Sequence, residues 1–227
     1  LKQMSKLGPS SVRLPFTERE EDVRTYFDKH KNSRSQEVEV DSIYEDLLHG
    51  AIRIDQRLVP KGLYDTALRL AKSTSSGLPL FKKRNTVIDE SVKLAEKQLR
   101  GEIKWPAAML GWRGQANGDT PKQRVVWMFP YSTNIIEGSF SEPLFNRLKH
   151  LPVFAAWISM DKVDEEITSL FKRQADSGGL ILSSDFSGFD QTITGQQNWI
   201  MNYFVKAFQN RYVSDIRTVF LNLRNLP

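Results

Sequence analysis

The sequence predicts an α+β fold in which a mainly helical N-terminal portion leads into a short sheet. Two observations support this class. Apolar residues between about residues 60 and 100 recur at the three- and four-residue intervals of amphipathic helices. Later apolar stretches are short, rich in β-branched and aromatic residues, and bounded by glycine or proline, as strands are. With 227 residues, 40% of them hydrophobic, the chain can bury a sizeable core.

The composition excludes several classes of protein. The chain contains no cysteine, which rules out disulfides and cysteine-based zinc sites. Its longest nearly apolar run, Leu151–Met160, is far shorter than the roughly 20 residues that a membrane-spanning helix needs. No P-loop or dinucleotide-binding fingerprint occurs. We therefore predict a globular protein without a membrane partner.

The net charge of +5 is concentrated in one stretch. Residues 61–124 hold 13 Lys or Arg against 6 Asp or Glu, a local excess of +7, and the rest of the chain sums to −2. Concentrated positive charge favours phosphate-rich partners such as nucleic acid or nucleotides, through attraction and counterion release. On charge alone, a solvated helix face explains the stretch equally well.

Four helices are predicted before residue 101. Thr17 and Glu20 fit a capping box, which predicts a charged helix from 18 to about 29, and residues 41–45 repeat the signal before Gly50. The third helix follows from the spacing of Leu63, Ala67, Leu70 and Ala71, and it runs into a loop of small residues and proline at 73–79. The fourth is expected from Val87 to Arg100, closed by Gly101.

Two strands and a final helix are predicted further along. A loop rich in Gly, Asn and Asp at 111–121 leads into a strand at 122–129, which ends at Pro130. The apolar run Leu180–Leu182 predicts a short buried strand that carries Asp185 to its carboxyl end. From about Thr194, a stripe at helical spacing predicts a helix packed against a sheet: Trp199, Ile200, Tyr203, Phe204, Ala207 and Phe208.

Two carboxylates near this strand end are suited to metal chemistry. Asp185 and Asp190 lie five positions apart, one at the strand end and one in the turn before the helix, so both can face one cleft. Nucleotidyl transfer needs divalent metals to activate a hydroxyl and neutralise a triphosphate, and carboxylate oxygens suit Mg²⁺. An isolated pair with this spacing is more often a pair of turn or capping residues.

The full seven-residue segment around the two aspartates favours the metal-binding interpretation. Residues 185–191, Asp-Phe-Ser-Gly-Phe-Asp-Gln, resemble motif A of viral RNA-dependent RNA polymerases, particularly those of double-stranded RNA viruses such as picobirnaviruses and partitiviruses. The resemblance implies that Asp185 is catalytic and binds the metals, Mg²⁺ or alternatively Mn²⁺. It also implies that Asp190 recognises the ribose. A carboxylate accepts a hydrogen bond from the 2′-hydroxyl, which argues for ribonucleotides.

A second segment resembles motif F of this family. Lys122 and Arg124 alternate on one face of the predicted strand, and in motif F such cations hold the triphosphate and counter the charge on the leaving pyrophosphate. Arg113, in the preceding predicted loop, is a weaker companion. Taken alone, a Lys-x-Arg pair is more often part of a solvated edge strand.

A third segment, residues 74–79, resembles motif G, a small-residue loop that lets a template strand pass close to the backbone. The resemblance implies that the loop and the cations after it bind the template without reading its sequence: Ser75, Ser76, Gly77, Lys82, Lys83 and Arg84. By itself the loop is better explained as a helix terminator. The three segments together, in the family's order G, F, A, are much more specific than any one of them.

The resemblance implies a right-handed polymerase of which this chain holds only part. We expect a helical N-terminal region at 1–72, fingers at 73–178 and the start of the palm at 179–227. The Ser-Gly of motif B and the Gly-Asp-Asp of motif C should follow motif A, yet neither occurs before Pro227. Because two metals need more carboxylates than Asp185 supplies, we expect this chain alone to be inactive. The remaining palm and thumb would belong to the same protein or to a second chain.

The implied reaction is template-directed ribonucleotidyl transfer that replicates and transcribes a viral RNA genome. Its partners would be RNA template and product, ribonucleoside triphosphates and, as a further partner, capsid protein, inside the virion or in the host cytoplasm. Two alternatives stay open. A non-catalytic RNA-binding module would use the basic stretch and keep the aspartates for structure, and a reverse transcriptase would prefer deoxynucleotides.

Overall fold

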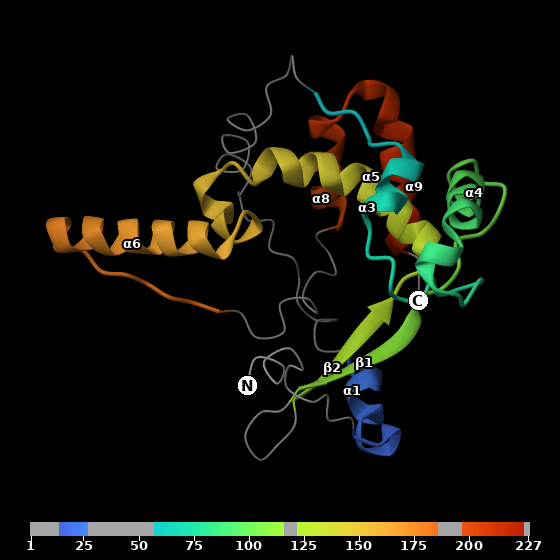
Figure 1. Ribbon diagram of the computed structural model, residues 1–227, viewed down its shortest axis with the longest axis horizontal. Helices are drawn as coiled ribbons and strands as arrows, with labels where there is room; N and C mark the ends of the chain where they lie inside the picture. The colour runs from blue at the N-terminus through green and yellow to red at the C-terminus, as the bar shows by residue number, and fades with distance from the viewer. Residues whose placement is uncertain (1–13, 27–56, 116–121, 186–196, 225–227) are drawn as a thin grey trace.

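The computed structural model describes residues 14–26, 57–115, 122–185 and 197–224. Its centre is a group of packed helices: α3 (Leu63–Arg69), α4 (Ile88–Leu99), α5 (Tyr131–Leu148), α8 (Gln197–Ala207) and α9 (Val213–Arg224). A two-stranded sheet lies below this group in Figure 1, and α6 (Met160–Ser177) extends to one side. The predicted α+β class is confirmed. None of the helices in the described ranges has the length and apolar content to cross a membrane.

The central helix of the core is α5. It buries Tyr131, Ile135, Ile136, Phe140 and Leu144 and packs against α3, α4 and α9. Small residues let its neighbours approach closely. A Cβ atom at Gly138 would lie 2.9 Å from Cγ2 of Thr66, so α3 crosses α5 where no side chain intervenes. The sequence patterns did not predict this helix, because apolar residues surround it rather than form one stripe.

An ion-pair cluster also fixes α3 to α5. The Glu142 carboxylate of α5 accepts hydrogen bonds from Lys61 Nζ at 2.7 Å and from Arg69 Nη1 at 2.8 Å. Part of the basic stretch therefore has an internal, structural use.

The predicted helices around the loop at 73–79 are confirmed as α3 and α4. In α4, Val92 and Ala95 face the core, and Gly101 follows the helix with φ +71, a conformation that glycine adopts without strain. The expected capping box near Thr17 is wrong. Phe16–Glu18 form a 3-10 turn (η2), so α1 (Glu20–Arg24) begins after Arg19 without a side-chain cap. The predicted helix before Gly50 lies outside the described residues.

The aromatic stripe of α8 packs against helices, not against a sheet as predicted. Phe208 meets Phe140 of α5 edge to face, with ring centroids 5.6 Å apart, and Phe204 meets Phe220 of α9 at 5.3 Å. The apolar faces of α5 and α9 lie beside α8, whereas the described sheet lies elsewhere (Figure 1). A short 3-10 turn, η7 (Asn210–Tyr212), joins α8 to α9.

The sheet consists of β1 (Met109–Gln115) and β2 (Lys122–Met128), paired antiparallel. The strand predicted after residue 121 is confirmed. The loop predicted at 111–121 is wrong for residues 111–115, which belong to β1. Gly111 fits a strand here because a side chain of the neighbouring strand fills the space: a Cβ at Gly111 would lie 3.1 Å from atoms of Met128, diagonally across the pair.

The buried strand predicted at Leu180–Leu182 is wrong. Leu180 is 101% exposed and Leu182 is 90% exposed, and the segment pairs with no strand among the described residues. A strand needs a neighbour for its backbone groups, and the described residues provide none here. The preceding α6 was not predicted, although Ser159 caps its start and Gly178, with φ +66, follows its end. A 3-10 segment, η6 (Pro152–Trp157), connects α6 to the end of α5.

Candidate functional site

Two arginines face each other across the sheet. Arg113 of β1 is directly opposite Arg124 of β2, so their side chains lie on the same face, and both are exposed. Neither has an ion-pair partner among the described residues. Like charges at opposite positions destabilise a strand pair, and an anion bound between them would remove that cost. Arg113 was expected in a loop, and its place in β1 brings it closer to the predicted motif F than the sequence indicated.

The other face of the sheet is partly covered by the N-terminal segment. Trp112 and Trp127 lie on it, because neighbouring residues of a strand point to opposite faces. The Arg19 guanidinium stacks over the Trp112 ring at 4.2 Å, and Tyr26 meets Trp127 edge to face at 5.9 Å. The N-terminal segment thus contacts both tryptophans, while Arg113 and Arg124 on the other face stay exposed. Lys122 is the first residue of β2, two positions before Arg124.

The loop with the predicted motif G is held by its own hydrogen bonds. The Ser76 amide donates to the Lys82 carbonyl at 2.7 Å, and the Lys82 amide donates to Ser76 Oγ at 3.1 Å. The Gly77 amide donates to Ser75 Oγ at 3.2 Å, and Ser75 pairs with Lys83 in an isolated bridge. Ser76 is buried, so its hydroxyl serves the loop, whereas Lys82 and Lys83 are exposed without an ion-pair partner in the described ranges.

The same loop is joined to the end of β2. The Tyr131 amide, at the start of α5, donates to the Ser76 carbonyl at 2.8 Å. Gly77 has φ +64 and packs so closely that a Cβ atom would lie 3.4 Å from Cα of Pro130. The predicted motif G loop therefore packs against Pro130 and Tyr131, which directly follow the strand of the predicted motif F about 40 residues later in the sequence. We call this meeting point, formed by residues 75–84 and 130–131, the loop corner.

Arg84 is a structural part of the loop corner. Its guanidinium lies 4.8 Å from the centroid of the Tyr131 ring, and its Nε donates to the Ser75 carbonyl at 3.2 Å. Partial burial lowers the pKa of Arg84. The Tyr131 hydroxyl donates to the Ala67 carbonyl at 2.6 Å, and burial raises its pKa. Of the three predicted template-binding cations, Arg84 is the one whose side chain contacts other residues in the described part of the chain.

Asp185 lies at the end of the exposed segment that follows α6. Its carboxylate is exposed, and Figure 1 shows this segment apart from the sheet. Among the described residues there is no group of three His, Cys, Asp or Glu side chains able to hold a metal ion. The described residues alone do not fit a two-metal site, which needs several oxygen ligands per ion. Asp190 lies outside the described residues.

The profile of one protein family, described as viral RNA-dependent RNA polymerase, matches residues 69–218, a range that includes the loop corner, the sheet and Asp185. This chain belongs to the viral RNA-dependent RNA polymerases. The potential RNA-dependent RNA polymerase of human picobirnavirus is 34% identical over 197 residues. That alignment covers 82% of this chain and 36% of the relative, so the chain spans about a third of the relative's length.

Solved polymerase structures show the same arrangement. The crystal structure of the RNA-dependent RNA polymerase of a human picobirnavirus matches with a TM-score of 0.72 and 28% identity, over 94% of this chain and 42% of that one. Its insertion-loop deletion mutant matches with a TM-score of 0.74 and 29% identity, over 94% and 44% of the two chains. The resemblance to double-stranded RNA virus polymerases of the picobirnavirus type is confirmed. The roles of single residues stay predictions.

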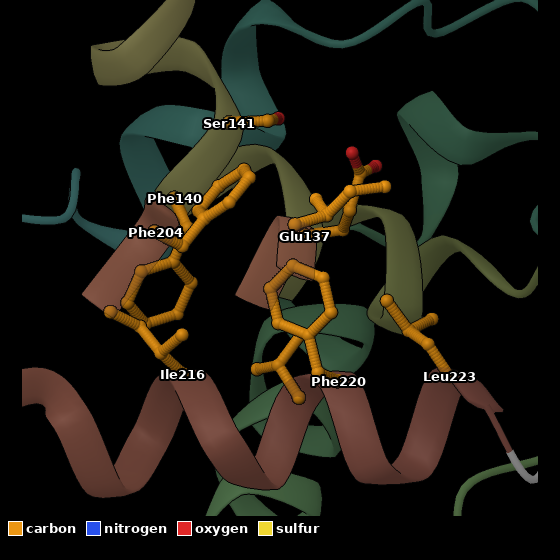
Figure 2. A pocket seen from close by; sticks show the side chains of 9 residues that line it. Glu137, Phe140, Ser141, Phe204, Ile216, Phe220 and Leu223 are labelled. Atoms are coloured by element: carbon orange, nitrogen blue, oxygen red, sulfur yellow. The ribbon is translucent and has the colours of Figure 1, made fainter. Parts of the chain in front are cut away.

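The sequence patterns missed one further feature of this polymerase chain, a pocket of about 220 Å³ between α5, α8 and α9. The rings of Phe140, Phe204 and Phe220 gather around it (Figure 2). Glu137 lines its edge, where burial raises the pKa of the carboxyl and the Ser141 hydroxyl opposes that rise. Walls this apolar do not suit RNA or a triphosphate. No local sequence signal joins these residues, because three separate helices supply them.

Proposed function

We propose that the polymerase to which this chain belongs carries out template-directed ribonucleotidyl transfer and thereby replicates and transcribes a viral RNA genome. In this reaction a 3′-hydroxyl attacks the α-phosphorus of a ribonucleoside triphosphate, loses its proton, and displaces pyrophosphate. The observation that carries the proposal is the exposed pair of Arg113 and Arg124 on the sheet that leads to the loop corner, within the range that matches the polymerase family.

Arg113 and Arg124 would hold the triphosphate. Two guanidinium groups can form several charge-assisted hydrogen bonds to phosphate oxygens and neutralise charge on the leaving pyrophosphate. The repulsion between them, unrelieved in the free protein, favours an anion at this place. Lys122, on the same strand, would add a third cation.

The loop corner would guide the template. Lys82 and Lys83 present exposed ammonium groups that can follow phosphates without reading bases. Ser75, which is exposed, would let the strand pass close to the backbone, while Ser76 and Arg84 hold the loop in shape. Gly77, predicted to bind the template, is buried against Pro130 and would act only by shaping the loop. Ser76 and Arg84 would then act on the template mainly through the loop they support.

Asp185 would be a ligand of the divalent metals, Mg²⁺ or Mn²⁺, which supply hydroxyl activation and charge neutralisation when bound. Asp190 would accept a hydrogen bond from the ribose 2′-hydroxyl. The remaining carboxylates would come from the rest of the palm. This division agrees with the described residues, which do not fit a two-metal site on their own.

The rest of the palm and the thumb would also cover α6. This helix buries none of its residues, and Ile167, Leu170 and Phe171 are 47%, 36% and 57% exposed. Leu180 and Leu182 continue the exposed apolar surface, and a strand added beside them would form the palm sheet. Capsid protein would be a further partner, with the enzyme inside the virion or in the host cytoplasm.

Primer extension by the complete polymerase tests the proposal. Purified enzyme, a single-stranded RNA template and labelled ribonucleotides should give template-length product, and deoxynucleotides should compete poorly. RNA binding without any synthesis would favour a non-catalytic RNA-binding module. Preferential incorporation of deoxynucleotides would favour a reverse transcriptase and overturn the role of Asp190.

A further inference from the structure

Phe81 occupies an unfavourable position for a large apolar residue. Its ring is 57% exposed, although Phe140 and Phe208 of the same chain are 5% and 0% exposed. Its backbone has φ +50, in the left-handed region that non-glycine residues rarely adopt. Exposure forgoes the stabilisation that burial of a phenyl ring would give, and the backbone conformation adds strain. The exposed ring and the strained backbone both disfavour the folded state, which indicates that Phe81 serves a role other than stability.

The loop holds Phe81 in a fixed place. The Phe81 amide donates to the Gly77 carbonyl at 2.8 Å, and the next residue, Lys82, exchanges two hydrogen bonds with Ser76. Behind them, the Arg84 amide donates to the Thr74 carbonyl at 3.0 Å. Because these hydrogen bonds already order the loop, binding of a ligand to the ring would not lose further conformational entropy in the loop.

The surroundings of the ring are strongly cationic. Lys82 and Lys83 follow it directly, and both are exposed without an ion-pair partner in the described part of the chain. The sequence from 66 to 88 contains five Lys or Arg and no Asp or Glu. An exposed aromatic ring beside cations is the combination by which proteins hold single-stranded nucleic acid, the ring stacking on a base and the cations binding phosphates.

We propose that Phe81 is a stacking platform for one unpaired base of the RNA template, while Lys82 and Lys83 hold the adjoining phosphates. The proposal rests on the proposed polymerase function and names a contact within it. A phenyl ring offers no hydrogen bond to a base edge, so the contact tolerates all four bases, as a template must. The ring would hold the template in register where it passes the loop corner.

The test compares variants of the complete polymerase in binding a single-stranded RNA that carries the fluorescent base 2-aminopurine at successive positions. At one position, wild-type enzyme should quench the fluorescence by stacking. Phe81→Ala should abolish this quenching and weaken binding about 5- to 100-fold, the range for one base stacked on an aromatic ring. Phe81→Trp should restore both.

Salt dependence separates the ring from the cations. Phe81→Ala should leave the slope of log affinity against log salt unchanged. Lys82→Ala should reduce the magnitude of this slope by about 1, because a protein with one phosphate contact fewer displaces fewer counterions when it binds. Tyr64→Ala is the matched control, since Tyr64 is 50% exposed but lies on α3 outside the loop. This variant should bind as wild type does.

Unchanged affinity and quenching in Phe81→Ala would overturn the inference. Unchanged affinity with a melting temperature lowered by several degrees would also overturn it, because the ring would then pack against another part of the polymerase. Failure of the proposed polymerase function would give a different result: the wild-type enzyme itself would not extend a primer, regardless of how the Phe81 variants bind RNA.

Discussion

The loop corner and the segment from α6 to Asp185 differ in how much support this chain gives them. At the loop corner, Ser76, Arg84 and Tyr131 are fixed by hydrogen bonds of 2.6 to 3.2 Å and by a stacked guanidinium. By contrast, α6 buries no residue, and Leu180 beyond it is fully exposed. The loop proposed to hold RNA is therefore positioned by contacts within this chain, whereas the proposed catalytic aspartate follows a helix and a segment that bury little against the described residues.

This contrast has a physical consequence. Local stability follows the number of buried apolar contacts, so the α6 segment should be the first part to open in this chain and should become ordered when the rest of the polymerase packs on it. Substitutions in the two regions should affect different properties of the enzyme. At the loop corner they should change binding, and on α6 they should change the stability of the complete enzyme.

The largest effect is expected at Asp185. In the complete polymerase, Asp185→Ala should reduce ribonucleotide incorporation at least ~10³-fold, because losing a metal ligand removes several kcal/mol of transition-state stabilisation. Template affinity should stay within about twofold, since the loop corner is intact. Primer extension and filter binding measure the two quantities. Asp176→Ala, an exposed carboxylate at the end of α6, is the control, and equal losses in both variants would contradict the assignment.

The next effect concerns the apolar face of α6. If the rest of the polymerase covers this face, Phe171→Ala should lower the unfolding free energy of the complete enzyme by about 2–4 kcal/mol, the cost of removing a buried ring. Lys172→Ala, its exposed neighbour, should change little. Denaturant titration measures both. An unfolding midpoint of Phe171→Ala equal to wild type would mean that the face stays open, and the contrast between the two regions would fail.

A third prediction tests the arginine pair. Arg124→Ala should lower kcat/KM for ribonucleotides about 10- to 100-fold, the value of one or two charge-assisted hydrogen bonds. It should also stabilise the free protein by a few tenths of a kcal/mol, because the repulsion from Arg113 disappears. Steady-state kinetics measure the expected loss of kcat/KM, and thermal melting measures the expected gain in stability. Lys104→Ala, another exposed cation of the basic stretch, should show neither change.

Arg84 offers a smaller and more specific effect. Arg84→Ala removes the stacking on Tyr131 and the hydrogen bond to Ser75, so template affinity should fall about 3- to 10-fold and stability by about 1 kcal/mol. Arg84→Lys should not restore either, because an ammonium lacks the planar guanidinium geometry. Full rescue by lysine would show that only the charge of Arg84 matters, as a direct phosphate contact requires.

The smallest effect is a pH dependence of stability at the pocket. Burial raises the pKa of Glu137 in the folded protein, so its contribution favours folding below that pKa and is lost as the pH rises through it. Glu137→Gln should therefore be more stable than wild type at neutral pH and should lose part of the pH dependence. Denaturant titrations between pH 4 and pH 8 measure this. Parallel curves for the two proteins would contradict the direction of the shift.

The sequence patterns predicted local features better than packing. α3, α4, β2 and the type of polymerase followed from spacing, glycine closure and three short motifs. The central helix α5 did not, because its buried residues lie all round it and its sequence includes Gly138 and Pro143. The contact of Arg84 with Tyr131 joins residues 47 positions apart, and no local pattern encodes that distance.

The errors have a common cause. Residues 111–115 were predicted as loop because of their glycines, but Met128 across the sheet fills the space at Gly111. Leu180–Leu182 were predicted as a buried strand because they are apolar, but burial and pairing both need a neighbour that the described residues lack. In each case the presence or absence of a neighbouring segment determined the structure, and the local sequence pattern carries no information on that neighbour.

The most direct test of the account is the position of the metal in the complete polymerase. Crystals soaked in Mn²⁺ and a ribonucleoside triphosphate would locate the ion by anomalous scattering. We predict an ion on an Asp185 carboxylate oxygen, at roughly 2.0–2.6 Å, with at least one further carboxylate from a part of the polymerase outside residues 1–227. An ion site that excludes Asp185, or one completed by residues of this chain alone, would contradict it.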